Sequence, residues 1–208
     1  MVIGVSGVAG AGKDLFVQAC IEQLKQQGKT ADSLAIANLL KLEARDWCLK
    51  HYNIDPVFCS RKDKEKIREF LVFHGTMKRK ASNGRHWINL TSSVLKDAQQ
   101  VYDYVFISDV RYSDFEKDEV YWIKEELKGA LVHVSQYEIC EVLDKGSWPK
   151  TKMDRVFLQP ANKEEERNDP VLKSKADYTL EWEKSRNINK DKYITSEVVT
   201  FIEWLSSQ

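Results

Sequence analysis

With 208 residues, of which 42% are hydrophobic, the chain can bury one substantial core, and we expect a single compact domain. Lysine plus arginine and aspartate plus glutamate each total 32, so the net charge is zero and gives no overall attraction to nucleic-acid polymers or anionic membranes. No apolar stretch approaches the ~20 residues that span a bilayer, and any binding of anions must be local.

The first half of the chain alternates between strand and helix patterns. Short apolar runs indicate strands, and apolar residues at helical spacing indicate helices. Glycine and proline mark the breaks between them. These patterns predict a strand at 2–5, a helix ending at Gly28, a strand at 33–36, helices at 38–51 and 61–73, a loop at 75–84 and a helix from Trp87.

The second half continues the alternation, with apolar strands at 102–108 and 130–134 and a helix at 115–128 between them. Apolar density falls from about 144 to 174, which predicts an exposed, movable flap or lid. A last strand at 178–182 and a closing helix at 196–205 follow. We therefore expect a three-layer α/β/α sandwich around a parallel five-stranded sheet.

Residues 7–14, GVAGAGKD, fit the phosphate-loop pattern GxxxxGK between a strand and a helix. Glycines let successive backbone N–H groups converge on phosphate oxygens, and the helix N-terminus adds its positive dipole end. An ordinary glycine-rich turn with an exposed lysine is the competing interpretation. The predicted nucleotide-binding residues are Gly7, Ala9, Gly10, Ala11, Gly12, Lys13 and Asp14.

Two aspartates are candidate magnesium ligands. Asp14 stands where the pattern normally carries a serine or threonine that holds Mg²⁺, and an ordinary first-turn acidic residue is its alternative. Asp109 ends a predicted strand that runs beside the phosphate loop in such folds. Arg111, two positions later, could grip a phosphate with its planar guanidinium, or form a surface salt bridge instead.

Basic residues also mark the two regions that would flank the loop. The flap carries several cations that could neutralise charge during transfer, although a solvated charged segment is the default for such a run. Region 68–87 would form an acceptor side, where Trp87 begins a helical apolar stripe and so favours the core. The flap cations are Lys145, Lys150, Lys152, Arg155, Lys163 and Arg167, and the acceptor candidates are Arg68, Gly75, Thr76, Arg85 and Trp87.

These residues resemble the deoxynucleoside monophosphate kinases of tailed phages and the P-loop nucleoside monophosphate kinase group. The resemblance rests on SGVAGAGKD, Ala37 to Lys41, Arg68 with Gly75-Thr76, Arg85 with Trp87, and SDVRY. It implies an enzyme that uses ATP and Mg²⁺ and acts on small nucleotides in the cytoplasm, that of the host if the protein is viral. It further implies no membrane or nucleic-acid partner and leaves a homodimer open.

The resemblance also assigns roles. Lys13 and the loop amides would bind ATP phosphates, and Asp14 and Asp109 would organise Mg²⁺. The catalytic set would be Lys13, Asp109, Arg111 and Arg155, and the acceptor would be bound by Lys41, Arg68, Arg85, Trp87 and Arg111. The acceptor-binding helices would lie at about 38–100.

Three other functions remain open on the sequence. The GKD ending is shared with phosphomevalonate kinases, so another small phosphorylated acceptor is one alternative. A nucleotide-dependent switch is a second, although the chain has no in-register guanine-recognition signature. An inactive fold used only for binding is a third.

Overall fold

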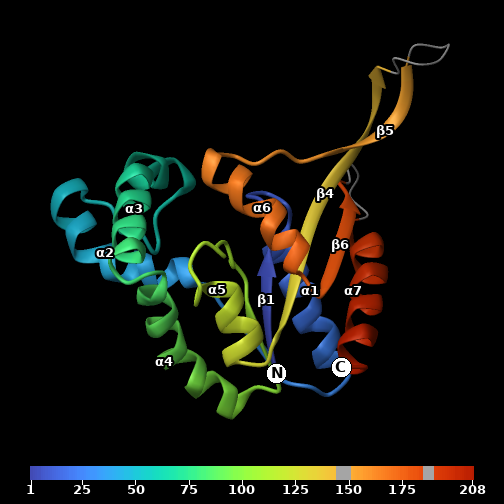
Figure 1. Ribbon diagram of the computed structural model, residues 1–208, viewed down its shortest axis with the longest axis horizontal. Coiled ribbons are helices and arrows are strands. Elements are labelled where there is room, and N and C mark those ends of the chain that lie inside the picture. Colours follow the sequence, from blue (N-terminus) through green and yellow to red (C-terminus); the bar gives the residue numbers. More distant parts are fainter. Residues whose placement is uncertain (144–150, 185–189) are drawn as a thin grey trace.

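The structure is a computed structural model that describes residues 1–143, 151–184 and 190–208, with the side chains of 143 and 190–195 left aside (Figure 1). Helices cover both faces of one central sheet, so the expected layered α/β architecture is present. The strands are β1 (Val2–Ser6), β2 (Ala31–Leu34), β3 (Tyr104–Ile107), β4 (Ala130–Leu143), β5 (Thr151–Phe157) and β6 (Tyr178–Glu183). The helices are α1 (Lys13–Gln26), α2 (Ile36–Tyr52), α3 (Arg61–Ala81), α4 (Arg85–Val101), α5 (Glu119–Tyr121), the π-helix η1 (Trp122–Glu126), α6 (Lys163–Lys175) and α7 (Lys190–Ser206).

The sheet has the strand order β2–β3–β1–β4–β5. β6 lies off this path and pairs with β4 on the edge opposite to β5. Five strands run parallel, but β5 runs antiparallel to the outer half of β4, so the sheet is mixed and the expected purely parallel sheet is wrong. The reason is that β4 continues well beyond Val134 and carries β5 as a hairpin that projects from the body (Figure 1).

Side-chain alternation along the strands divides the core into two. Ile3 and Val5 face one side, where they join a cluster with α1 and α7, whereas Val2 faces the other side with α4 and η1. Alternate residues of a strand point to opposite faces, so a sheet covered on both sides reads as a continuous apolar run. This explains why β1 is buried along its whole length.

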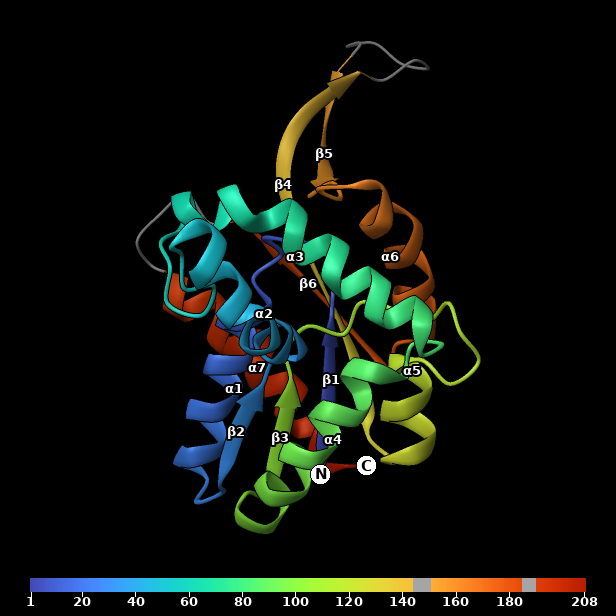
Figure 2. The same cartoon turned by 90° about the vertical axis from the view of Figure 1, so that its left-hand side faces the viewer.

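Helices α2, α3 and α4 form an arm beside the sheet's β2–β3 side (Figure 2). Ser60 caps α3 by accepting a hydrogen bond from the Asp63 amide (3.1 Å). The helix then continues to Ala81, so the expected loop at 75–84 is wrong. Gly75 stays helical where it packs against α4, and its carbonyl oxygen accepts a hydrogen bond from the Trp87 indole (3.1 Å).

Two further expectations need correction. The helix expected at 115–128 begins only at Glu119, because Asp118 caps it, and it soon widens into the π-helix η1. The expected movable flap holds β5 and α6, and Leu172 of α6 is buried in the core, so this helix is docked. Residues 144–150 of that flap, including Lys145 and Lys150, lie outside the described residues.

Candidate functional site

The phosphate loop joins β1 to α1, and its conformation requires glycine. The φ angles of Gly7, Gly10 and Gly12 are 134°, 85° and 89°, in the range that favours glycine. A Cβ atom on Gly7 would also strike the Val134 carbonyl oxygen, and one on Gly12 would strike the Trp182 ring. The loop is therefore fixed by β4 and β6 as well as by its own sequence.

Lys13, the first residue of α1, folds back over this loop. Its Nζ donates hydrogen bonds to the carbonyl oxygens of Gly7 (2.8 Å) and Val8 (2.9 Å). Burial and the neighbouring Arg111 lower the pKa of Lys13, while Glu165, Asp14 and Asp109 oppose that shift. These five charged groups therefore share one electrostatic environment around the loop.

Glu165 of α6 was not expected at the loop, yet it makes direct contact there. Its Oε2 accepts hydrogen bonds from the Ala9 amide (3.2 Å) and the Ala161 amide (3.1 Å). Sequence spacing gave no signal for this pairing, because 156 positions separate the two residues. One backbone N–H group of the phosphate loop thus already donates its hydrogen bond to a carboxylate.

The two candidate magnesium ligands occupy different settings. Asp14 is exposed in the first turn of α1. Asp109 is buried and caps α2, since its two oxygens accept the amide hydrogens of Ile36 (2.7 Å) and Ala37 (2.8 Å). Each oxygen keeps a further lone pair, so the cap does not exhaust the carboxylate.

Among the described residues, no cluster of three or more His, Cys, Asp or Glu side chains suits a metal. Mg²⁺ bound through one or two carboxylates and substrate phosphates needs no such cluster. The assignment of Asp14 and Asp109 to Mg²⁺ therefore stays a prediction.

A cleft of about 200 Å³ lies between the α2–α3–α4 arm and the end of β3. It gathers seven residues singled out in the sequence: Lys41, Arg68, Gly75, Thr76, Trp87, Asp109 and Arg111. It also includes residues that were missed, among them Lys64, Arg79, Tyr112 and Glu119. Nothing local in the sequence marks the last three, because their place depends on how the arm packs against the β3 end.

Five cationic side chains line this cleft. One of them, Arg79, pairs with Asp118, and the other four are Lys41, Lys64, Arg68 and Arg111. Burial and the proximity of the other three lower the pKa of Lys64. Within the described parts of the chain, the Lys64 ammonium and the Arg111 guanidinium form no ion pair with an acidic side chain. Glu65, which pairs with Arg68 (2.5 Å), offsets part of this repulsion, and the remaining positive charge indicates a site for an anion.

The inner end of the cleft is built from buried ionisable groups. The Arg79 guanidinium pairs with Asp118 and stacks over the Tyr112 ring (3.9 Å to its centre). Glu119 accepts the amide hydrogens of Arg111 (2.6 Å) and Tyr112 (3.0 Å). Burial raises the pKa of Glu119 to about 8, against these hydrogen bonds.

Three expected site residues have other surroundings. Arg85 forms a bidentate ion pair with Glu126 (2.8 and 3.0 Å) and does not line the cleft. Arg155 lies on the projecting β5, 3.7 Å from a Glu181 oxygen and over the Tyr137 ring. Trp87 lines the cleft but is only 4% exposed, which agrees with the expected core role.

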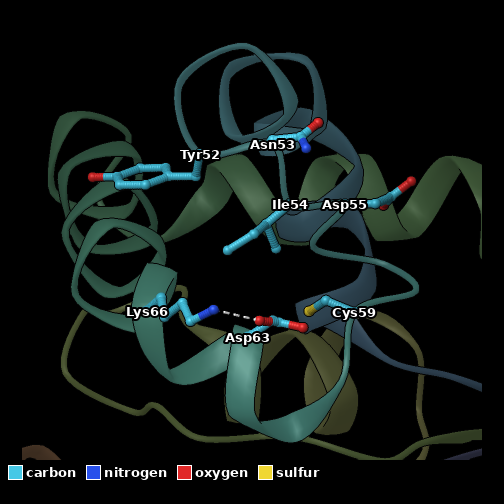
Figure 3. Close-up of a pocket in the computed structure, with 7 residues that line it drawn as sticks. All are labelled: Tyr52, Asn53, Ile54, Asp55, Cys59, Asp63 and Lys66. Carbon is cyan, nitrogen blue, oxygen red and sulfur yellow. Dashed lines mark hydrogen bonds and ion pairs between the residues drawn. The ribbon is translucent and has the colours of Figure 1, made fainter.

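A second hollow, of about 370 Å³, lies at the far end of the arm (Figure 3). Its two aspartates are already engaged, Asp55 by Arg45 (2.7 Å) and Asp63 by Lys66 (2.7 Å). The first cleft includes Arg111, whose charge helps burial to lower the pKa of Lys13 in the phosphate loop, so this cleft is the candidate acceptor site.

The chain thus combines a glycine-rich loop at a helix N-terminus with a mostly parallel sheet covered by helices on both faces, the setting that the phosphate-loop pattern requires. No protein-family model and no curated protein matches the sequence. Among solved structures, the shikimate kinase from Acinetobacter baumannii in complex with shikimate is similar at 13% identity and a TM-score of 0.42, over 99% of this chain and 93% of that chain.

The shikimate kinase from Bacteroides thetaiotaomicron is similar at 11% identity and the same TM-score of 0.42, over 99% of this chain and 98% of that chain. A likeness of this size carries no inference about activity. Separately, no helix in the described residues is long and apolar enough to cross a membrane.

Proposed function

We propose that the protein transfers the γ-phosphoryl group of ATP to a small phosphorylated acceptor, and that this acceptor is a deoxynucleoside monophosphate. The observation that carries the proposal is the group of cations Lys41, Lys64, Arg68 and Arg111 in the cleft. Lys64 and Arg111 have no acidic partner among the described residues, so an acceptor that brings its own negative charge would relieve their repulsion. An uncharged acceptor would not.

Arg111 would connect the two halves of the reaction. It lines the acceptor cleft, and its charge also lowers the pKa of Lys13 at the phosphate loop. A guanidinium placed between donor and acceptor phosphates can neutralise charge on both. Arg111 is therefore the residue we expect to act on the transferring group, with Lys13 and the loop amides holding the ATP phosphates.

Asp14 and Asp109 would hold Mg²⁺, which would neutralise phosphate charge when bound. The cap on α2 fixes the Asp109 carboxylate without using both lone pairs of each oxygen. An acceptor phosphate is already ionised near neutral pH, so positioning and charge neutralisation would suffice without a general base. We also propose that Arg155, on the β4–β5 hairpin, takes part in phosphoryl transfer.

The test is ADP formation with Mg²⁺, ATP and each of the four deoxynucleoside monophosphates, beside mevalonate 5-phosphate and shikimate. We expect turnover with at least one deoxynucleotide and a loss of at least about a hundredfold in Lys13→Ala. Lys25→Ala, in the last turn of the same helix, is the matched control and should leave turnover unchanged.

Other outcomes would change the proposal in defined ways. Turnover with mevalonate 5-phosphate alone would keep the ATP half and replace the acceptor. Turnover with shikimate alone would show that the four cations do not select a phosphorylated acceptor. Turnover that is equal in Lys13→Ala and in the unmodified protein would overturn the phosphate-loop mechanism.

A further inference from the structure

The start of α6 lies against the phosphate loop. Asn162 caps the helix by accepting the Glu165 amide hydrogen (2.9 Å), which fixes where the Glu165 side chain begins. That side chain then reaches the Ala9 amide (3.2 Å). Leu158, just before the helix, lies over Gly10, since a Cβ atom there would be 3.5 Å from its Cδ2. Residues 158–165 therefore cover the loop.

The Glu165 carboxylate has the chemistry of an internal anion. The loop sits at the N-terminus of α1, where backbone N–H groups and the helix dipole favour negative charge. A carboxylate that accepts a backbone N–H there uses a donor suited to a phosphate oxygen. Its charge also reaches Lys13, where it opposes the lowering of the pKa by burial and Arg111.

Glu165 is distinct from its acidic neighbours in the same turn. Glu164 is exposed and pairs with Arg167 (3.0 Å), and Glu166 is exposed as well. Glu165 alone of the three contacts the loop. The contact is therefore specific to one position on the helix and does not arise from the acidic turn as a whole.

We propose that Glu165 occupies the phosphate loop as an internal competitor, which the phosphates of a nucleotide must displace. This proposal rests on the proposed function in one respect, namely that the loop binds nucleotide phosphates. It adds that the free protein holds its own loop in a self-bound state. Nucleotide binding would then release the first turn of α6.

Contacts further along α6 limit what can move. Asp169, one turn after Glu165, bonds to the His133 ring of β4 (3.0 Å), and Leu172, on the same face, is buried in the core. These contacts hold the rest of the helix against the sheet. Displacement of Glu165 therefore affects residues 158–165, which connect directly to β5 and its hairpin.

The measurement is calorimetric binding of inorganic tripolyphosphate, a probe with no base and no transferable acceptor. We expect Glu165→Gln to bind it about three- to tenfold more tightly than the unmodified protein, because the internal competitor loses its charge. Glu164→Gln, in the same turn but directed at Arg167, is the matched control and should change affinity by less than about twofold.

Glu165→Asp separates contact from simple repulsion. Aspartate keeps the charge but is one methylene shorter, so it should lose the Ala9 contact and tighten binding by at least about twofold. Affinity equal to that of the unmodified protein in Glu165→Asp would overturn the proposal, even with tight binding in Glu165→Gln. Should Glu165→Gln fail to fold by circular dichroism, the Glu165→Asp result decides alone.

Failure of this proposal and failure of the proposed function look different. Unchanged affinity in both Glu165 variants, together with normal phosphoryl transfer, would overturn the internal competitor only. Tighter binding in both variants without transfer to any acceptor would support it and overturn the kinase. No tripolyphosphate binding in any variant would overturn both.

Discussion

Lys64 shows how a side chain can oppose folding and still serve a site. It stands beside Lys41, Arg68 and Arg111 without an acidic partner among the described residues, and burial together with these neighbours lowers its pKa. Removing one member of such a cluster relieves repulsion in the folded protein. The sequence placed three of the four cations at the acceptor side, but Lys64 lay within a charged run that reads as solvated surface.

Lys64→Gln should therefore weaken function while leaving stability intact or slightly improved. We expect the KM for the acceptor to rise about tenfold, since a phosphate contact is lost. The free energy of unfolding should rise by no more than about 0.5 kcal/mol, because solvent screens the repulsion. Steady-state kinetics and urea unfolding measure the two effects. Lys62→Gln, exposed on the same helix, should change neither.

Glu119 predicts how stability depends on pH. Burial raises its pKa to about 8 in the folded protein, above the ordinary value of 4.5. The contribution of protonated Glu119 to the free energy of unfolding is thus fully present below about pH 4.5 and is lost as the pH rises through 8. Relative to Glu119→Gln, the unmodified protein should lose roughly 2–3 kcal/mol of unfolding free energy between pH 6 and 8.

Urea unfolding of both proteins across that range gives the comparison. Parallel pH profiles for the two would show that Glu119 is ionised throughout and would contradict the assignment. The Arg111 and Tyr112 amides should still find an acceptor in the glutamine side chain, so Glu119→Gln is expected to fold.

Gly12 should be intolerant of any side chain. Its φ of 89° and the Trp182 ring beside it both oppose a Cβ atom. We expect Gly12→Ala to lower the free energy of unfolding by at least about 2 kcal/mol and to weaken tripolyphosphate binding. Gly28→Ala has a similar φ of 75° but open space around it, so it should cost less and leave binding unchanged.

Among the elements, the strands were the most predictable and the helical arm the least. Apolar runs located β1 and β3 because strands buried on both faces leave little choice of residue. In β6 the buried Leu180 and Trp182 alternate with more exposed residues. Gly75 was expected to begin a loop, but it stays within α3, where it packs closely against Leu40 of α2 and accepts a hydrogen bond from Trp87 of α4 despite its weak helix propensity. The length of β4 was missed, since its outer half is mostly half-buried and has no continuous apolar run.

The α3 cap offers a test at this scale. Ser60→Ala removes the hydroxyl that accepts the Asp63 amide, so the unfolding free energy should fall by about 1 kcal/mol. Thermal unfolding measures the change. Ser93→Ala, whose hydroxyl only returns to the Leu90 carbonyl of its own helix, should shift stability by less than about 0.5 kcal/mol. Equal losses in both variants would contradict the cap.

For the whole molecule, the layered architecture followed from the alternation of strands and helices, whereas the candidate site followed only in part. The motif gave the phosphate loop directly, because its chemistry is local. The acceptor cleft depends on contacts between α2, α3 and the β3 end, so Arg79, Tyr112 and Glu119 could not be placed in advance. The same holds for Glu165, which meets the loop across most of the chain's length.

The hairpin should be separable from the body. Pairing of Glu138 with Val156 marks where a short Asn-Gly turn could replace residues 139–155. We expect the free energy of unfolding of this variant to lie within about 1 kcal/mol of that of the unmodified protein, because little of β5 is buried. Urea unfolding and tripolyphosphate binding measure the outcome. A collapse of stability would show that the hairpin supports the core.

The projecting β5 also bears on the behaviour of the protein at high concentration. In the described part of the chain it pairs with β4 on one side only, leaving a strand edge on which a second molecule could add its own strand. Lys152, Asp154 and Arg155 place both signs of charge along that edge. This mixture of charges opposes self-association. Substitutions that remove it should favour ordered aggregation, even where they stabilise the folded protein.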